Sequence, residues 1–412
     1  SMAALRFSRD WLVISSGSKF LAHSCGDKSD NQKPFVYDCS TAVKEPAPEE
    51  KGNDGHVNSK GSDRILAFTF SPSGKYFALI DDSKRLVLFR TEPSWECLSV
   101  RCLVRRCTSL AITHAEGQIL AADKSGDVYS FSILEAEKAG ELRLGHLSML
   151  LDVALSPDDK YVLTADRDEK IRVSSLRSPY DIESFCLGHR EFVSTILVLP
   201  NHPNLLLSGS GDGTLRLWEY KSGREVLCCE LTAFLEPESA GSEKKCTVTR
   251  ITHCTQGDYI AVLCSSLPVV HILQLDSQSL QLTHKQKILL EHRGWDISYA
   301  EPSSLWVLQE DKKEAALLYR LSGGQWQCIA RPNGEKILRT SVHKRFLCSL
   351  FAESVGLESP YDSLYKVTFD NMGDYLRNKE VRLQQRKRKG EQPLASRETK
   401  KHCKNSQSSV QC

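Results

Sequence analysis

The residues of this sequence with the clearest potential for joint chemistry are His189, Asp212 and a nearby serine, because these residue types form the catalytic triad of many hydrolases. The same residues also suit a structural role. An aspartate in an Asp-Gly turn can accept hydrogen bonds from His189 and from a strand hydroxyl, Ser208 or Ser210, with Trp218 beyond. Because they stand inside a repeated pattern, we favour the structural role and predict no catalytic residue.

Other residues that often carry chemistry lack the necessary spacing. Cys97, Cys102 and Cys107 could suggest a metal site, but the chain has no Cys-x-x-Cys pair. Glycines alternate in residues 209–213 without a helix expected after them, so they do not form a phosphate-binding loop. The fifteen cysteines are an odd number, and we expect reduced thiols. The sequence therefore predicts no metal and no cofactor in this chain.

A repeat of about 43 residues positions the triad-like residues. Gly188-His189 begins its clearest copy, and Gly145-His146 begins the preceding copy, in which His146 and Asp166 are also interpreted as structural. A repeat of this type predicts an all-β, seven-bladed β-propeller, with eight blades as the alternative. Terminal strand groups at 11–38 and 346–367 are expected to join and close the ring. The third strands of the internal blades should end near 89, 131, 174, 218, 273 and 319.

The predicted propeller spans residues 3–370. Residues 40–62 and 232–247 are rich in charged and small residues and are expected to be flexible insertions. Residues 371–412 are expected to form a basic helix and a disordered tail. Residues 377–404 contain eleven Lys or Arg and three Asp or Glu, which leaves a net charge of −6 on the remainder of this +2 chain.

The tail contains a run of four basic residues, Arg386, Lys387, Arg388 and Lys389. Such a run is typical of nuclear import signals and of contacts with phosphate, and a solvated disordered tail is the alternative. We therefore expect the protein in the nucleus, with the cytoplasm as a second location. The sequence has no apolar run of the length needed to cross a membrane.

One turn of the repeat carries more charge than folding requires. Residues 166–172 hold six charged side chains in seven positions, and strand alternation would present Lys170 and Arg172 on the same side. Composition alone favours an ordinary solvated turn. The alternative is a binding surface formed by Asp166, Arg167, Asp168, Lys170 and Arg172.

The blades resemble a known family. Residues 78–90, 122–131, 145–154 and 164–173 look like the corresponding runs of the WD-repeat, non-catalytic subunit of tRNA (guanine-N7)-methyltransferase. The resemblance implies a heterodimer in which a separate Rossmann-fold subunit binds S-adenosylmethionine and methylates guanine 46 of tRNA. This chain would hold that subunit in its active shape and would bind tRNA as part of the complex.

The resemblance also implies where the partner docks. A basic residue at the position of Arg172 would face a glutamate of the partner, with Lys170, Asp168, Arg167 and Asp166 as its neighbours. The aromatic-acid pair that usually ends this strand is replaced by Ser174-Ser175, which changes the packing beside the docking residues.

Two other functions remain as alternatives. Many WD-repeat rings are substrate receptors of cullin-type ubiquitin ligases and carry a Trp-Asp-x-Arg element at a blade end. The best blade end of this chain, Trp218-Glu-Tyr-Lys221, does not match that element. A hydrolase that uses the Ser, His and Asp residues would be active without a partner.

Overall fold

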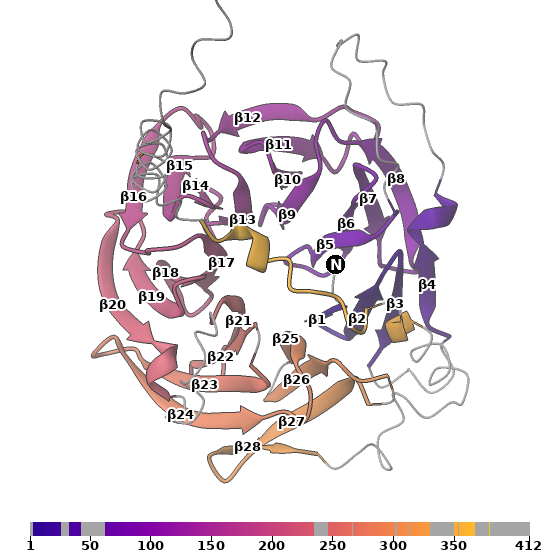
Figure 1. The fold of residues 1–412 in the computed structure, drawn as a ribbon. Coiled ribbons are helices and arrows are strands. Elements are labelled where there is room, and N and C mark those ends of the chain that lie inside the picture. The colour runs from indigo at the N-terminus through magenta and orange to yellow at the C-terminus, as the bar shows by residue number, and fades with distance from the viewer. Residues whose placement is uncertain are drawn as a thin grey trace, which may run out of the picture. The chain divides into compact units, whose positions relative to one another are not determined.

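The computed structural model forms a ring of β-sheets (Figure 1). Within its described part, seven four-stranded antiparallel sheets are each built from consecutive strands, which confirms the predicted seven-bladed propeller. The chain divides into one unit, Ser1–Tyr365, and a second unit, Lys366–Cys412. The structure describes residues 3–25, 33–42, 62–234, 246–265, 267–300, 303–312, 314–329, 350–352, 354–366 and 379.

Each blade is a meander whose first strand lies nearest the centre of the ring and whose fourth strand lies at its rim (Figure 1). The described third strands of the internal blades end within three residues of the positions that the repeat predicts. The first four blades consist of β1 (Ala4–Ser8), β2 (Trp11–Ser16), β3 (Lys19–Ser24) and β4 (Phe35–Asp38); β5 (Ile65–Phe70), β6 (Tyr76–Asp81), β7 (Arg85–Arg90) and β8 (Glu96–Cys102); β9 (Cys107–Ile112), β10 (Gln118–Asp123), β11 (Asp127–Ser132) and β12 (Glu141–Gly145); and β13 (Leu150–Leu155), β14 (Tyr161–Asp166), β15 (Lys170–Ser175) and β16 (Ile182–Leu187).

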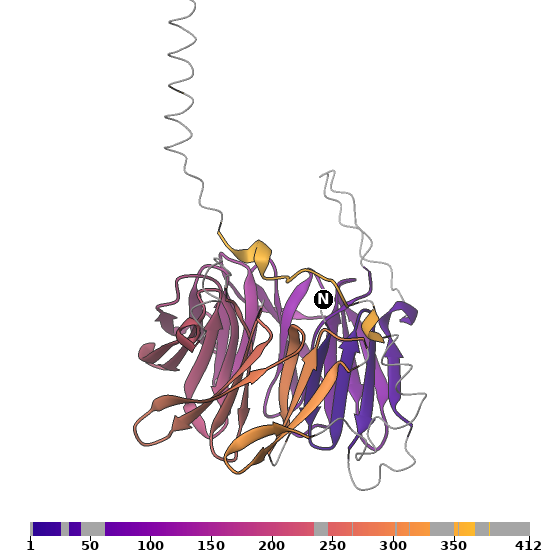
Figure 2. The same ribbon diagram turned by 60° about the horizontal axis from the view of Figure 1, so that its bottom comes forward.

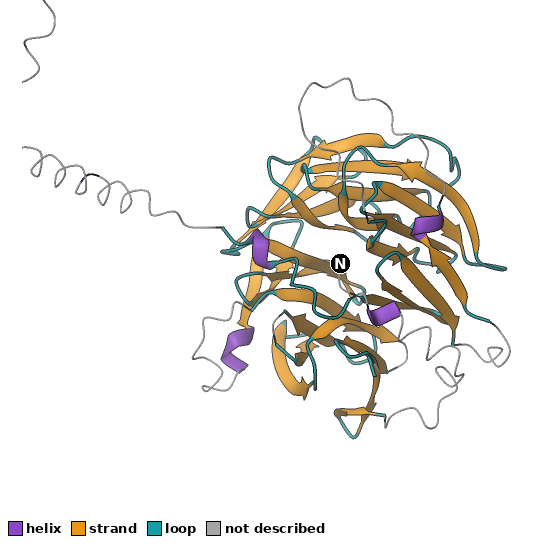
Figure 3. Cartoon of the chain, turned by 45° about the vertical axis from the view of Figure 1, so that its right-hand side comes forward, coloured by secondary structure: helices purple, strands orange, loops and turns teal. Residues whose placement is uncertain are grey.

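The remaining blades follow the same order. They consist of β17 (Val193–Leu199), β18 (His202–Ser210), β19 (Thr214–Glu219) and β20 (Arg224–Glu230); β21 (Val248–Cys254), β22 (Tyr259–Cys264), β23 (Val269–Asp276) and β24 (Gln281–Leu289); and β25 (Gly294–Ala300), β26 (Ser304–Gln309), β27 (Ala316–Ser322) and β28 (Gln325–Cys328). Short 3-10 turns are η2 (Cys39–Thr41) after β4, η3 (Leu231–Phe234) after β20 and η6 (Asp362–Leu364) near the end of the first unit. Figure 3 shows that the rest of the described chain is almost entirely strand and loop.

The apolar cores lie between neighbouring blades. The middle strands are apolar runs because both of their faces are covered, and five of the six residues of β14 are buried. Leu217 of blade five and Val262 of blade six belong to one such core. The two blades approach closely at Gly209, where a Cβ atom would lie 2.3 Å from a methyl carbon of Val248. A glycine at this position therefore lets the sheets pack together.

The ring closes differently from our prediction. Blade one takes all four strands from the N-terminal segment, and the described part of residues 346–367 adds no strand. Instead, β1 packs against β25 of the last blade. The backbone N–H of Leu5 donates to Asp296 Oδ2 at 3.0 Å, and that of Phe7 donates to Ser298 Oγ at 3.2 Å. The seam is thus joined by side chains and a shared core, not by a shared sheet.

A C-terminal strap, residues 350–352 and 354–365, crosses one face of the ring instead (Figures 1 and 2). At its start, Leu350 and Phe351 are buried in the core that joins the first and last blades. The hydroxyl oxygens of Ser354 and Ser16 lie 2.6 Å apart. At its end, the Tyr365 hydroxyl donates to the Gly211 carbonyl at 2.8 Å. The strap therefore connects the closing seam to blade five.

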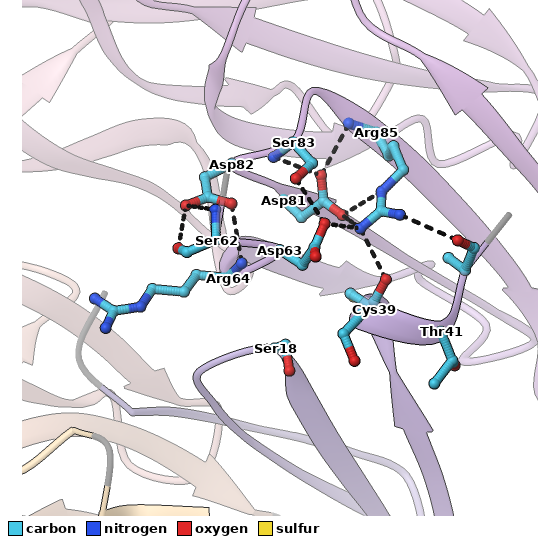
Figure 4. A network of polar contacts seen from close by, with 12 residues as sticks. Ser18, Cys39, Thr41, Ser62, Asp63, Arg64, Asp81, Asp82, Ser83 and Arg85 are labelled. Atoms are coloured by element: carbon cyan, nitrogen blue, oxygen red, sulfur yellow. Dashed lines mark hydrogen bonds and ion pairs between the residues drawn. The ribbon is translucent and has the colours of Figure 1, made fainter. Parts of the chain in front are cut away.

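Both ends of the first insertion are held at the junction of blades one and two (Figure 4). Arg85 donates from Nη2 to the Cys39 carbonyl and to Asp63 Oδ1, each at 2.8 Å, and from Nε to Asp81 Oδ2 at 2.7 Å. Most of the predicted insertion 40–62 lies outside the described residues, as do residues 235–245 of the insertion 232–247.

The basic C-terminal segment is also outside the described part, apart from the exposed Lys379. The predicted contacts Arg386, Lys387, Arg388 and Lys389 fall in that segment, so they stay predictions. In the part of the chain that is described, no helix is both long and apolar enough to span a membrane.

Candidate functional site

The triad-like residues of blade five meet in a buried network. His189 Nε2 lies 2.7 Å from Ser208 Oγ, and His189 Nδ1 lies 3.0 Å from Asp212 Oδ2. Trp218 donates from Nε1 to the same Ser208 oxygen at 2.8 Å. Gly213 follows Asp212 with a φ of 77°, a left-handed conformation that favours glycine in this tight turn.

The order serine, histidine, aspartate is that of a hydrolytic triad, but burial excludes nucleophilic attack. Ser208 is 0% exposed, and the His189 side chain is 1% exposed. A substrate could not reach the serine oxygen, which already accepts the indole N–H of Trp218. The network instead satisfies polar groups that the blade buries.

The same network explains the ionisation of Asp212. Burial by itself would raise the pKa of this carboxyl. The hydrogen bond and charge of His189, the Arg190 amide and Thr214 outweigh that effect and lower the pKa of Asp212 well below its ordinary value. Asp212 is therefore a charged structural group at neutral pH.

Blade four contains a related network. Its carboxylate comes from the last residue of β14, whereas that of blade five comes from the turn after β18. His146 Nε2 lies 2.7 Å from Thr164 Oγ1, and His146 Nδ1 lies 3.3 Å from Asp166 Oδ2. Asp166 also accepts the backbone N–H of Lys170 at 3.0 Å. It is 0% exposed. Asp166 therefore belongs to the blade and not to the exposed contact surface in which the sequence analysis placed it.

The other charged residues of this turn are exposed or half-buried. Asp168 is exposed, while Arg167, Lys170 and Arg172 are half-buried. Lys170 Nζ donates to the Asp168 carbonyl at 3.1 Å and lies 3.5 Å from Asp166 Oδ2. The alternation expected for β15 is present, because Ile171 between the two cations is buried.

Arg172 is held in place by neutral acceptors. Its Nη1 donates to the Gly145 carbonyl at 3.0 Å, and its Nε donates to Ser174 Oγ at 3.1 Å. Ser174 stands at the blade end where blade five has Trp218, so the missing aromatic ring is replaced by a hydroxyl that orients this guanidinium. Among the described residues, no carboxylate lies within ion-pair distance of Arg172. Partial burial lowers the pKa of Arg172.

Arg167 has a role that the sequence did not reveal. Its Nε donates to the Leu364 carbonyl at 3.1 Å, so it holds the C-terminal strap. Leu364 and Tyr365 come at the end of the first unit of the chain. No periodic pattern relates residues 197 positions apart, which is why this contact could not be predicted.

Blade four also exposes apolar side chains beside the cations. Phe185 and Leu187 of β16 are exposed, as is Leu147 in the loop after β12. These residues were not among the site residues predicted from the sequence. The sequence signal for an exposed apolar surface was the presence of large apolar residues at alternate positions of an outer strand, Phe185 and Leu187.

The centre of the ring is a less suitable site. A cavity of about 390 Å³ lies there, lined by the inner strands and by Tyr361 of the strap. Arg6 and Arg250 are both paired with Asp296, at 3.0 and 2.7 Å, so the cations already share a carboxylate. Across the described ranges, no group of three or more His, Cys, Asp or Glu is placed to hold a metal ion.

Comparisons with known proteins agree with the repeat pattern. A family model described as the tRNA methyltransferase TRM82 WD40 domain matches residues 25–143 and 135–316. The tRNA (guanine-N(7)-)-methyltransferase non-catalytic subunit WDR4 of Mus musculus is 54% identical over 380 residues, which cover 92% of this chain and 91% of the relative. The subunit of the same name from Homo sapiens is 51% identical over 366 residues, covering 89% and 87%.

A more distant relative and a solved structure also match most of the chain. The non-catalytic subunit wuho of Drosophila mojavensis is 29% identical over 396 residues, which cover 93% of this chain and 98% of the relative. A chain in the crystal structure of the Mitotic Checkpoint Complex has a TM-score of 0.59 and 14% identity, covering 77% of this chain and 86% of that chain. The latter likeness concerns the fold alone.

Proposed function

The chain belongs to the family of WD-repeat non-catalytic subunits of tRNA (guanine-N7)-methyltransferase, and we propose that it holds the catalytic subunit of that enzyme in its active conformation. It is a non-catalytic subunit, and its family name implies a separate catalytic partner. The burial of Ser208 and His189 agrees with this role, because it excludes these two residues from acting on a substrate.

A rigid ring can activate a partner without touching the reacting atoms. A catalytic subunit that is only partly in its competent conformation gains activity when another protein binds that conformation preferentially. The gain is limited by the difference in affinity for the two conformations. Seven blades that share apolar cores form the kind of rigid scaffold that this mechanism needs.

The single observation that carries the docking site is the arrangement of Arg172. Its guanidinium is oriented by Gly145 and Ser174 but has no carboxylate partner among the described residues. A carboxylate of the catalytic subunit would complete a charge-assisted pair there, with Lys170 and Asp168 as neighbours. Such a pair fixes register and orientation more than it adds raw affinity.

The remaining parts of the proposal rest on the family resemblance and on the basic C-terminal sequence. The assembly is a heterodimer, S-adenosylmethionine binds to the catalytic subunit, and this chain reaches tRNA through the complex. Residues 386–389 supply basic groups for tRNA phosphates or for nuclear import. The nucleus is the proposed location, with the cytoplasm as a second one. The alternative role as a cullin-type substrate receptor is not favoured, because the relatives carry the methyltransferase name.

Co-expression tests this function. The chain and the catalytic tRNA (guanine-N7)-methyltransferase subunit should elute together on size-exclusion chromatography in equal amounts. The chain purified alone should not methylate tRNA. Separate elution of the two proteins, or equal co-purification of a ubiquitin-ligase adaptor in place of the methyltransferase, would contradict the proposal.

A further inference from the structure

Exposed apolar side chains are concentrated in the outer strands of blades three and four and in the loops beside those strands. Ten large hydrophobic residues of the described chain are exposed, and six of them lie between residues 142 and 187. Single exposed apolar residues are normal on a protein surface, but such a concentration marks an interaction site. The six are Leu142, Leu147, Tyr180, Ile182, Phe185 and Leu187.

The register of blade four places two of these residues beside the cations. Phe185 of β16 is the direct partner of Arg172 in β15, and Leu187 is the direct partner of Lys170. Directly opposed residues project from the same face of a sheet and lie within contact distance. The intervening Ile171 packs in the opposite direction, into the core shared with blade five. The four side chains thus form a two-by-two block, with the two cations along β15 and the two apolar residues beside them along β16.

The end of blade three continues this block. Arg172 donates to the carbonyl of Gly145, the last residue of β12, and Leu147 follows two residues later. Leu147 is fully exposed. The cations of blade four therefore lie between apolar side chains from two neighbouring blades.

Blade five shows that the repeat does not require this arrangement. In blade five, Arg216 lies opposite Cys228, which matches the pair Arg172 and Phe185. Thr214 lies opposite Glu230, which matches the pair Lys170 and Leu187. Blade five therefore has neither a large apolar residue nor an unpaired arginine there, since Arg216 is paired with Glu225. The apolar residues of blade four are not needed to build a blade.

We propose that Leu147, Phe185 and Leu187 form one docking surface with Lys170 and Arg172, and that it binds an apolar face of the catalytic subunit beside a carboxylate. This inference rests on the proposed function, in which the catalytic subunit docks at Arg172. Burial of the leucines and the phenylalanine supplies association free energy, and it excludes water from the charged pair, which strengthens that pair. The pair in turn sets the register of the apolar contact.

The chain offers a matched control for a test. Leu289 is the partner of Val269, the first residue of β23, just as Leu187 is the partner of Lys170, the first residue of β15. Leu289 is 72% exposed and Leu187 is 61% exposed. Leu187→Ser and Leu289→Ser therefore make the same change at the same blade position, in blades four and six. Neither change removes a core contact, and thermal unfolding of both variants should match the wild type.

The experiment is a titration of the full chain and its variants with the catalytic subunit, by calorimetry. We expect Leu187→Ser to weaken association by about fivefold or more, because docking can bury only the exposed 61% of this leucine. Phe185→Ser should act in the same direction, and Leu289→Ser should bind as the wild type does. Wild-type affinity of Leu187→Ser would overturn the inference.

Two further arms separate the inference from the proposed function. If Arg172→Leu weakens association but Leu187→Ser does not, the apolar surface is not part of the interface although the docking site holds. If neither variant changes association, the docking site itself is wrong. Sedimentation of the chain alone tests whether the docking surface instead binds a second copy of the same chain. Self-association that Leu187→Ser abolishes, with unchanged binding of the catalytic subunit, would overturn the inference.

Discussion

Arg172 and Arg216 occupy equivalent positions in neighbouring blades, but only Arg216 has an ion-pair partner among the described residues. Each is the third residue of its strand, opposite Thr164 or Ser208. Arg216 Nη1 lies 2.6 Å from Glu225 Oε2, whereas Arg172 Nη1 donates to a backbone carbonyl. Arg216 therefore forms an ion pair inside its own blade, whereas the charge of Arg172 can pair with a carboxylate of another protein.

Arg172→Leu should impair pairing with the catalytic subunit and leave the ring folded. Removing one member of an interfacial charge pair costs about 2 to 5 kcal/mol of association free energy, because the other charge is left buried. Calorimetric titration and thermal unfolding of the same variant measure both effects. A variant that pairs normally, or one that is simply unfolded, would refute the assignment of Arg172.

Arg216→Leu should give the opposite result. The substitution removes an ion pair inside blade five, so the unfolding temperature should fall while association with the catalytic subunit stays close to that of the wild type. Comparing the two arginine variants in the same two assays separates folding from docking. Loss of association in a stable Arg216→Leu ring would show that blade five belongs to the interface.

Stability should decrease in acid, partly through Asp212. The folded state lowers the pKa of Asp212, so its contribution is fully present above the unfolded pKa of about 4 and is lost as the pH falls toward the folded value. Denaturant unfolding between pH 7 and pH 3 measures this loss. Asp212→Asn should be less stable at pH 7 and show a shallower pH dependence. An unchanged slope would mean that other carboxyl groups account for it.

Asp296 should hold the closing seam. It accepts from Leu5, Arg6 and Arg250, and its pKa is lowered because the two arginines outweigh the effect of burial. Asp296→Ala would leave the partly buried guanidinium groups of Arg6 and Arg250 without their shared carboxylate, which should lower the free energy of unfolding. We expect a lower unfolding temperature and earlier proteolytic cleavage within β1. Cleavage first at another blade would argue against this seam as the weak point.

The C-terminal strap should stabilise the ring. Phe351→Ala removes a buried aromatic ring from the core of the seam and should cost about 3 to 5 kcal/mol of unfolding free energy. Tyr365→Phe removes the hydroxyl that contacts Thr247 and Gly211 and should cost about 1 to 3 kcal/mol. Chemical denaturation measures both. Wild-type stability of both variants would show that the strap lies on the ring without stabilising it.

The repeat made the blades predictable, but not their closure. Gly-His starts, Asp-Gly turns and apolar runs recur with a fixed period, so strand ends and the His189 network followed from sequence. The segment around Leu350 and Phe351 was predicted to be a strand because it is apolar. In the structure, these side chains fill the core between blades that already have four strands each.

The candidate site was only partly predictable, because a local sequence pattern does not show which side chains the fold buries. The charged turn is visible in the sequence, but charge alone did not show that Asp166 is buried. Its alignment with Asp81 and Asp123, which also accept a backbone N–H four residues later, was the available signal. Among the described residues, no element covers Phe185 and Leu187, and no local sequence pattern encodes such an exposure.

The central claim is that this ring contributes a docking surface to an active site on another protein. Its most direct test is guanine-N7 methylation of tRNA by a fixed amount of catalytic subunit, titrated with wild-type chain or with Arg172→Leu. We predict that the wild type raises the rate to saturation at one equivalent, that Arg172→Leu requires far more protein, and that the chain alone is inactive. Methylation by the chain alone, or a rate that does not respond to it, would contradict the account.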